Sequence, residues 1–179
     1  MWPGSATVSG LMVIERPGLI PAARAAQHCF FRQTWPFKQL VVFNATNKRL
    51  NVWPRSRVKE IRLRRMPVAQ MLHILRENAD GEWCVLWDCD CWYDRSVLER
   101  HMRVAERETA VLFRNSTAYG LSDQRAYVIS DDRVLHGSFL RAAKIDFEKP
   151  FYRQLARLKV IDNPADLIVK FVNRIRYEA

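Results

Sequence analysis

Two carboxylates directly follow one of the most apolar segments of the chain. The run Trp83-Cys84-Val85-Leu86-Trp87 leads straight into Asp88-Cys89-Asp90. Two negative charges one residue apart repel each other, and the end of a buried strand would not carry them for stability alone. A divalent cation removes the conflict, because Mg²⁺ and Mn²⁺ take oxygen ligands and are commonly held by one or two carboxylates together with substrate phosphates. Asp88-x-Asp90 therefore predicts a site for a metal-bound diphosphate.

Polar residues also follow the other strands that the sequence predicts before this site. We expect strands at Thr7–Ile14, Gln39–Phe43 and Glu82–Trp87. Helices are expected between them, and this alternation is typical of a parallel α/β sheet. Such sheets bind ligands beyond the carboxyl ends of their strands. Glu15-Arg16 and Asn44–Asn47 should therefore lie at the same edge as Asp88.

Two helices should separate these strands. The first is predicted from apolar residues at helical spacing, Leu19, Ala23, Ala26 and Phe30. Pro21 falls in its first turn, where a missing N–H does no harm. The second helix carries an apolar stripe from Val68 to Ala79, with Pro67 at its start and Gly81 in the position expected for a C-terminal cap.

The remainder of the sequence is more mixed. Asp94 should cap a helix, with Ser96 and Glu99 at capping-box spacing and His101 packed in that helix or partly exposed on it. Further strands are expected at Thr109–Phe113, Arg125–Ile129 and Val134–His136. Further helices are expected at Ser138–Ala143, Glu148–Leu158 and Ala165–Ile175.

Length and composition favour one intracellular globular domain. The chain has 179 residues, 49% of them hydrophobic, which is enough for a buried core and excludes disorder, collagen and coiled coil. No apolar run reaches the roughly 20 residues of a membrane-spanning helix. The first residues lack the basic start and apolar stretch of a secretory signal. We therefore expect a cytoplasmic protein.

The chain is strongly basic, with a formal net charge of +10. This charge implies attraction to a polyanion such as nucleic acid, an anionic membrane or a nucleotide. Much of it lies between Lys48 and Arg65, opposed there only by Glu60. The candidate nucleic-acid-binding residues in this basic stretch are Arg49, Arg55, Arg57, Lys59, Arg62, Arg64 and Arg65. A solvated loop face is the alternative interpretation of the stretch.

The four cysteines do not form a recognisable metal or disulfide framework. Cys29, Cys84, Cys89 and Cys91 lack the paired C-x-x-C units of a structural zinc site. Cys84 lies in the predicted buried strand, where cysteine acts as a small hydrophobe. A zinc or redox role for Cys89 and Cys91 is the less favoured alternative.

At this point three segments resemble a known family, the family 2-like glycosyltransferases of the GT-A fold. Val13–Pro17 is similar to the family's first strand and nucleotide loop. Gln33-Thr34-Trp35-Pro36, followed by Leu40–Phe43, is similar to its Gln-x-x-Pro turn and second strand. Ala79–Trp83, leading into Asp88-Cys89-Asp90, is similar to the approach to its metal-binding Asp-x-Asp. The resemblance covers Val13 to about Arg103, roughly half of the chain.

The resemblance implies a fold, a donor and a metal. The expected fold is α/β: a single-domain, Rossmann-like sandwich with a mostly parallel central sheet and flanking helices. Residues 7–103 would form the nucleotide-sugar-binding half of the single 1–179 domain, and residues 104–179 the acceptor-binding half. The resemblance further implies a UDP-sugar donor and Mn²⁺ or Mg²⁺ as cofactor. Asp88 and Asp90 would bind the metal, while Glu15, Arg16, Asn44 and Asp88 would contact the donor.

The chain departs from the family at two kinds of position. Asn44 stands where the family usually has a carboxylate pair, one member of which holds the uridine; an amide could still hydrogen-bond a pyrimidine edge. Inverting members of the family use a late carboxylate as general base. The candidates are Asp131, Asp132, Asp146 and Glu148. Glu148 is favoured, with Asp146 second, and a helix N-terminal residue favoured by the dipole is the alternative role for Glu148.

The positive net charge of the chain favours DNA as the acceptor substrate. Sugar and lipid acceptors do not require such a protein, whereas DNA would supply phosphate contacts. The chain loosely resembles phage enzymes that glycosylate 5-hydroxymethylpyrimidines in DNA. Trp53, Trp92 and Tyr93 could stack on a base or on the sugar, or could equally be ordinary core residues, which is the more common role of such side chains. Two alternatives stay open: a glycosyltransferase acting on a surface polysaccharide or lipid, and an inactive nucleic-acid-binding protein. The oligomeric state is not predicted.

Overall fold

The computed structural model describes residues 6–51 and 55–105, together with the strands within 110–172. Side chains are described for residues 6–51 and 56–103. The elements in chain order are β1 (Val8–Ile14), η1 (Pro17–Leu19), α1 (Ile20–Phe31), β2 (Lys38–Asn44), η2 (Arg55–Arg57), β3 (Val58–Arg62), α2 (Val68–Glu77), β4 (Trp83–Leu86), β5 (Cys91–Tyr93), α3 (Val97–Ala105), β6 (Ala110–Arg114), β7 (Ser116–Gly120), β8 (Ala126–Ile129), β9 (Phe139–Arg141), β10 (Lys159–Asp162) and β11 (Ile168–Val172). Among the helices that the structure describes, none has the length and apolar character that crossing a bilayer requires.

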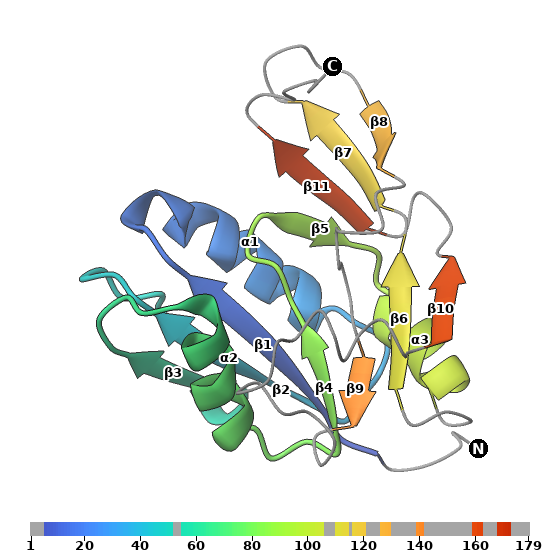
Figure 1. Cartoon of the computed structure of the whole chain (residues 1–179), viewed down its shortest axis with the longest axis horizontal. Coiled ribbons are helices and arrows are strands. Elements are labelled where there is room, and N and C mark those ends of the chain that lie inside the picture. Colours follow the sequence, from blue (N-terminus) through green and yellow to red (C-terminus); the bar gives the residue numbers. More distant parts are fainter. Residues whose placement is uncertain are drawn as a thin grey trace.

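The main sheet has seven strands in the order β10-β6-β9-β4-β1-β2-β3 (Figure 1). β1 pairs in parallel with β2 and β4, and β2 pairs in parallel with β3. β9 runs antiparallel between β4 and β6, while β10 is parallel to β6. The predicted α/β fold with a mostly parallel central sheet is thus confirmed. The division into a donor half and an acceptor half stays a prediction.

The main sheet is buried on both faces because a helix covers each of them. Successive side chains of its central strands point to opposite sides, so apolar residues are needed at nearly every position. One face packs on α1, where Met12, Leu40 and Val42 meet Ala26 and Phe30. The other face packs on α2, where Leu11, Val41 and Phe43 meet helix residues Met71, Leu72 and Leu75. The continuous apolar runs in β1 and β2 are therefore explained by helices on both faces, as the sequence indicated.

Gly81 has a different role from the predicted C-terminal cap. α2 ends at Glu77, with Asn78 as its C-cap residue. Gly81 instead lies against β1, where its N–H donates to Ser9 Oγ at 2.8 Å. A Cβ on Gly81 would lie 2.5 Å from Ser9 Oγ and 2.7 Å from the Ser9 backbone nitrogen. The glycine is required because the chain passes so close to β1 before it enters β4.

Two predicted helices are wrong, and the described strands show why. β9 lies within the expected helix 138–143, and β11 lies within the expected helix 165–175. β9 fills the space between β4 and β6, so pairing on both of its edges outweighs a weak local helix signal. β11 pairs with β5 and β7 through the residues Ile-Val-Lys-Phe-Val, whose branched and aromatic side chains suit a strand.

A second, four-stranded sheet in the order β5-β11-β7-β8 was not predicted. β5 is only three residues long, and β7 is a five-residue run that includes Ser, Thr and Gly, so neither gives a strong strand pattern. β3 was also missed, because a strand at the sheet edge needs few apolar residues. The strands expected at 109–113 and 125–129 are confirmed as β6 and β8 within one residue at each end. The elements expected at 134–136 and 148–158 lie outside the described residues.

The close approach at Gly81 gives a stability prediction. We expect Gly81→Ala to lower the free energy of unfolding by about 1–3 kcal/mol, because the added methyl group meets backbone atoms of β1 that cannot move away. Gly18→Ala is the matched control: a Cβ at Gly18 meets nothing within 4 Å, and its effect should stay within about 0.5 kcal/mol. Urea unfolding of both variants measures the difference. Equal stability of the two variants would contradict the role assigned to Gly81.

Candidate metal and donor site

The residues that follow β1, β2 and β4 share one edge of the main sheet. These strands are parallel, so their carboxyl ends point the same way (Figure 1). Backbone hydrogen bonds continue the pairing past the strand ends: Trp87 N–H donates to Leu11 at 2.9 Å, and Ala45 N–H donates to Ile14 at 2.9 Å. Glu15, Asn44 and Asp88 are therefore brought to a common edge, as the sequence predicted.

The chain turns back sharply after Asp88, and an aromatic stack holds the turn closed. The rings of Trp87 and Tyr93 lie 3.7 Å apart at an interplanar angle of 20°. The Tyr93 hydroxyl accepts a 2.7 Å hydrogen bond from the Asp88 N–H. Trp87 is anchored in turn, because its indole N–H donates to the Ala26 carbonyl of α1 and its ring packs edge-on against Phe30. Residues 87–93 thus form a closed turn, and we call them the acidic turn.

The acidic turn gathers three potential metal ligands. One ligand atom each from Asp88, Asp90 and Cys91 lies within 4.8 Å of the other two. Both carboxylates are partly buried and Cys91 is buried. Spacing of this kind fits a single divalent cation, for which two carboxylates are suitable ligands. The predicted pairing of Asp88 with Asp90 is therefore geometrically possible. Cys91, which the sequence indicated only as a less favoured zinc or redox candidate, joins them.

The electrostatics of the acidic turn keep Tyr93 neutral. Burial raises the pKa of Tyr93 well above its ordinary value, and the nearby Cys91, Asp88 and Asp90 raise this pKa further. The phenol therefore stays protonated and serves as a fixed hydrogen-bond partner for the acidic turn. The sequence left two roles open for Tyr93, stacking on a ligand or packing in the core; the structure places its ring in the core, stacked on Trp87.

A second turn holds the far end of the acidic turn in place. The buried Gln33 side chain donates to the Asp94 carbonyl at 2.8 Å and accepts from the Leu98 N–H at 3.0 Å. Lys38 fixes this turn by donating to the Gln33 and Trp35 carbonyls at 2.8 and 2.6 Å. Burial, followed by the charge of Arg57, lowers the pKa of Lys38 to about 8. The ammonium group therefore remains mainly charged at neutral pH and can keep both hydrogen bonds.

The predicted cap of α3 is present in modified form. Asp94 Oδ1 accepts hydrogen bonds from the N–H and hydroxyl of Ser96, and these bonds lower the pKa of Asp94. Glu99 does not complete a capping box in the described contacts; it accepts from the Thr34 hydroxyl and pairs with Arg103. His101 is buried, in line with a packed helix residue.

Asn44 is placed at the predicted edge, but its side chain is committed to the protein. It is fully buried, and its amide donates to the Lys48 carbonyl and to Glu60 Oε1. Its oxygen accepts from both the N–H and the hydroxyl of Thr46. Every donor and acceptor of the amide is therefore used to shape the loop after β2. A direct contact between this side chain and a pyrimidine would require some of these bonds to break.

Two further predicted donor contacts lie after β1. Glu15 is half-buried and its carboxylate lies 3.7 Å from Arg65, a residue of the basic stretch. Arg16 is exposed, and its carbonyl accepts from the Leu19 N–H at the start of α1. The ion pair brings the segment that follows β3 to the end of β1. The basic stretch therefore borders the same sheet edge as the acidic turn.

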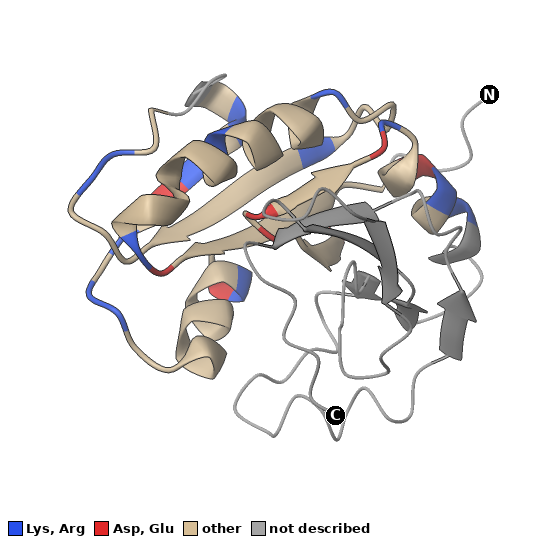
Figure 2. Cartoon of the chain, turned by 90° about the horizontal axis from the view of Figure 1, so that it is seen from above, with Lys and Arg blue, Asp and Glu red and all other residues tan. Residues whose placement is uncertain are grey.

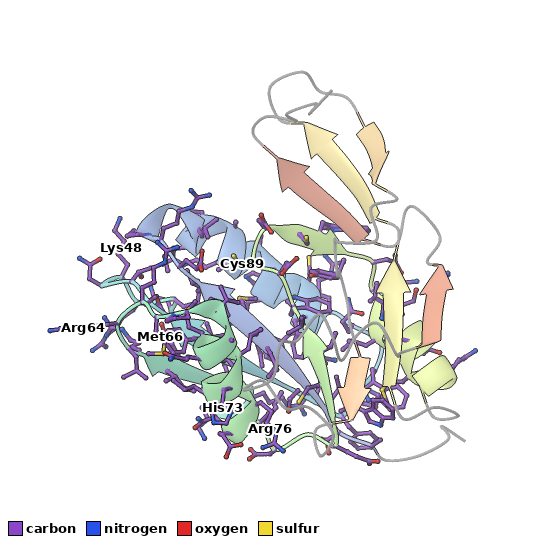
Figure 3. All side chains as sticks on the ribbon, viewed as in Figure 1. Lys48, Arg64, Met66, His73, Arg76 and Cys89 are labelled. Atoms are coloured by element: carbon purple, nitrogen blue, oxygen red, sulfur yellow. The ribbon has the colours of Figure 1, made fainter. Side chains whose placement is uncertain are left out.

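The basic stretch is largely exposed in the part that the structure describes. The side chains of Arg49, Arg57, Lys59, Arg62, Arg64 and Arg65 are all exposed. Arg62 donates to the Asn47 carbonyl, which ties the segment after β3 to the loop after β2. Figure 2 shows basic residues along these loops, and Figure 3 shows Lys48 and Arg64 extending outward at the left of the molecule, with Arg76 at the lower end of α2.

Several predicted residues cannot be placed. The candidate bases Asp131, Asp132, Asp146 and Glu148 lie outside the described residues, as does Trp53. The side chain of Arg55 is also outside them, although its backbone lies in η2. Trp92 is described: it is 41% exposed, between the buried Cys91 and Tyr93 on the short strand β5.

Comparisons with solved structures identify the fold. S. aureus TarS 1-349 in complex with UDP-GlcNAc has a TM-score of 0.70 at 10% identity, over 96% of this chain and 60% of that one. A mannosyltransferase from Pyrobaculum calidifontis, in complex with GDP-Man and Mn²⁺, has a TM-score of 0.65 at 12% identity, over 99% and 61%. The chain has a GT-A-type glycosyltransferase fold.

The likeness concerns the fold and only part of each neighbour. The longer S. aureus TarS structure has a TM-score of 0.63 at 14% identity, and the match spans 93% of this chain but 37% of that protein. The chain thus spans between 37% and 61% of the three neighbours described. No protein-family model matches the sequence, and the curated proteins gave no match either.

The Tyr93 hydroxyl provides a test of how the acidic turn is held. Tyr93→Phe keeps the ring but removes the acceptor of the Asp88 N–H, so we expect the free energy of unfolding to fall by about 1–2 kcal/mol. Tyr93→Leu also removes the stack on Trp87 and should cost clearly more. Denaturant unfolding and near-ultraviolet circular dichroism compare the two. If Tyr93→Phe matches the unaltered protein in both measurements, the hydrogen bond does not hold the turn.

Proposed function

We propose that the chain is a metal-dependent glycosyltransferase that moves a sugar from a nucleotide-sugar, favoured to be a UDP-sugar, onto a hydroxyl group. One observation carries this proposal: two carboxylates meet at the carboxyl edge of a GT-A-type sheet with their ligand atoms within 4.8 Å. The neighbours in complex with UDP-GlcNAc and with GDP-Man and Mn²⁺ support the same class of donor and cofactor.

The chemistry expected at this edge is mainly electrostatic. Asp88 and Asp90 would hold Mn²⁺ or Mg²⁺, which, when bound, offsets the negative charge of the departing nucleoside diphosphate. The Trp87–Tyr93 stack keeps the two carboxylates at one place, so little reorganisation is needed when the donor binds. Glu15 and Arg16, after β1, are proposed to contact the nucleotide. Removal of the acceptor proton is assigned to Glu148, with Asp146 as the other candidate.

DNA is the proposed acceptor, with a hydroxymethylated pyrimidine supplying the hydroxyl group. The support is the exposed basic stretch and its position at the same sheet edge as the acidic turn, where Arg65 pairs with Glu15 after β1. Phosphate contacts from these side chains would supply affinity without sequence preference. A cytoplasmic location, in the host cell if a phage encodes the protein, goes with this acceptor.

The first experiment tests reaction and acceptor together. The protein is incubated with Mn²⁺, a panel of UDP-sugars and duplex DNA that carries 5-hydroxymethylcytosine or 5-hydroxymethyluracil, and the digested nucleosides are weighed. We expect the mass of the nucleoside to rise by one hexose. Asp90→Asn should lower the rate of this modification at least about a hundredfold, because the metal loses a charged ligand. Asp80→Asn is the matched control, since this exposed carboxylate precedes β4 at the opposite edge of the sheet.

The other outcomes separate the alternative functions. Donor hydrolysis without DNA modification would leave the glycosyltransferase in place and redirect the acceptor to a polysaccharide or lipid. DNA binding without donor turnover would favour an inactive nucleic-acid-binding protein. Equal loss of turnover in Asp80→Asn and Asp90→Asn would contradict the role of the acidic turn.

The basic stretch can be tested separately by its salt dependence. We expect Lys59→Ala and Arg64→Ala each to weaken DNA binding and to lower the slope of log K against log salt by about 1, as loss of one phosphate contact does. Arg76→Ala is the control, because Arg76 lies on α2 and pairs with Glu77 (Figure 3). Fluorescence anisotropy at several salt concentrations provides the slopes. A slope unchanged in all three variants would rule out these side chains as the DNA contact.

A further inference from the structure

The Cys91 thiol is aimed at the two carboxylates of the acidic turn. Its Sγ lies 3.9 Å from Asp88 Oδ2 and 3.9 Å from Asp90 Oδ1. The side chain is only 4% exposed, so the sulfur faces the carboxylates from the protein interior. The cluster therefore combines two oxygen ligands with one sulfur ligand, which is a different donor set from an Asp-x-Asp pair alone.

The position of the sulfur is set by β5. Side chains alternate along a strand, so Cys91 and Tyr93 point inward while Trp92 points outward. Tyr93 is tied to the Asp88 N–H, and Cys91 is paired with Lys170 in the antiparallel ladder with β11. The thiol is thus held by two independent constraints, one inside the acidic turn and one from the second sheet.

The distances are close to those of a metal site. In a tetrahedral zinc site, Zn–S of about 2.3 Å and Zn–O of about 2.1 Å place sulfur and oxygen about 3.6 Å apart. The two observed separations of 3.9 Å exceed this value by a few tenths of an ångström. Small side-chain rotations would close that difference. The fourth coordination position would be available to a diphosphate oxygen of a donor.

We propose that Cys91 is a third protein ligand of the cation, so that the site selects a thiophilic divalent ion such as Zn²⁺ over Mg²⁺. Sulfur ligands favour Zn²⁺ and its soft analogue Cd²⁺, whereas an all-oxygen site suits Mg²⁺ and Mn²⁺. On coordination the S–H bond is replaced by a metal–sulfur bond, and the proton leaves to solvent. This inference rests on the metal site of the proposed function and adds a cation preference to it: Zn²⁺ would bind there more tightly than the Mn²⁺ or Mg²⁺ assigned above. In the alternative, Cys91 is a small buried hydrophobe that happens to adjoin two acids.

A Cd²⁺ titration of the full chain tests the proposal, because a cadmium–thiolate bond gives an ultraviolet charge-transfer band that oxygen ligands do not. We expect this band to saturate at one equivalent of Cd²⁺, to disappear in Cys91→Ala and to persist in Cys89→Ala, the matched control within the same turn. Cys91→Ala should weaken Cd²⁺ and Zn²⁺ binding by about tenfold or more while changing Mg²⁺ binding much less.

A second set of variants protects the test against misfolding, since Cys91 belongs to the packed core. If Cys91→Ala does not fold, persistence of the band in single variants of Cys29, Cys84 and Cys89 assigns it to Cys91 by elimination. Loss of the band in any of those three variants, with Cys91 unchanged, would overturn the proposal. Displacement of bound Mn²⁺ by Cd²⁺ without any charge-transfer band would also overturn it, leaving an oxygen-only site.

The test of Cys91 as a metal ligand can fail or succeed independently of the proposed glycosyl transfer. The charge-transfer band is measured without nucleotide, so a band that depends on Cys91 supports the ligand role even if no sugar is transferred. Conversely, sugar transfer with Mn²⁺ and no band would retain the proposed function and reject the thiol ligand. Absence of any metal binding to the unaltered protein would reject both the ligand role and the metal dependence.

Discussion

The hydrogen bond between the Asp88 N–H and the Tyr93 hydroxyl closes the turn on which the candidate site depends. Without it, the strand that ends at Leu86 would release its two carboxylates toward solvent, where their repulsion would separate them. The Trp87 ring stacks on Tyr93 and is itself fixed to α1, so the closure is linked to the core. Two acids and a thiol can then share a space small enough for one ion.

The same turn is held from its other end by a chain of polar contacts that begins far away in the sequence. Lys38 donates to the Gln33 and Trp35 carbonyls. The Gln33 side chain in turn donates to the Asp94 carbonyl and accepts from the Leu98 N–H. Burying a lysine and a glutamine costs free energy unless their polar atoms are paired. Here Lys38 and Gln33 are hydrogen-bonded, which offsets that cost. Their hydrogen bonds also fix the backbone between the end of β5 and the start of α3.

The sequence was sufficient for the first half of the fold but only for part of the site. Long apolar runs identified β1, β2 and β4, and an apolar strand ending in two acids predicted the candidate metal site at their carboxyl ends. A metal role for Cys91 was the less favoured interpretation of the sequence, because the orientation of this side chain depends on a three-residue strand that pairs with β11, nearly eighty positions later. The donor contact of Asn44 stays a prediction from its residue type, and only the folded loop reveals that its amide is hydrogen-bonded to Lys48, Glu60 and Thr46. The expected helices at 138–143 and 165–175 failed for a related reason, since distant strand pairing outweighed local pattern.

Glu60 ties part of the basic stretch to the loop after β2. It is the one acid between Lys48 and Arg65, and its carboxylate accepts from the Asn44 amide and from the Leu50 N–H. Its charge therefore serves to fix the loop after β2 against β3, and it is not spread over the surrounding cations. Arg62 adds a bond to the Asn47 carbonyl of the same loop. The described cations therefore lie on segments that are joined to one another at Asn44, Asn47 and Leu50. Under the proposed function, a polyanion would meet these side chains on backbone that is already tied at those points, which lowers the free energy spent on ordering it.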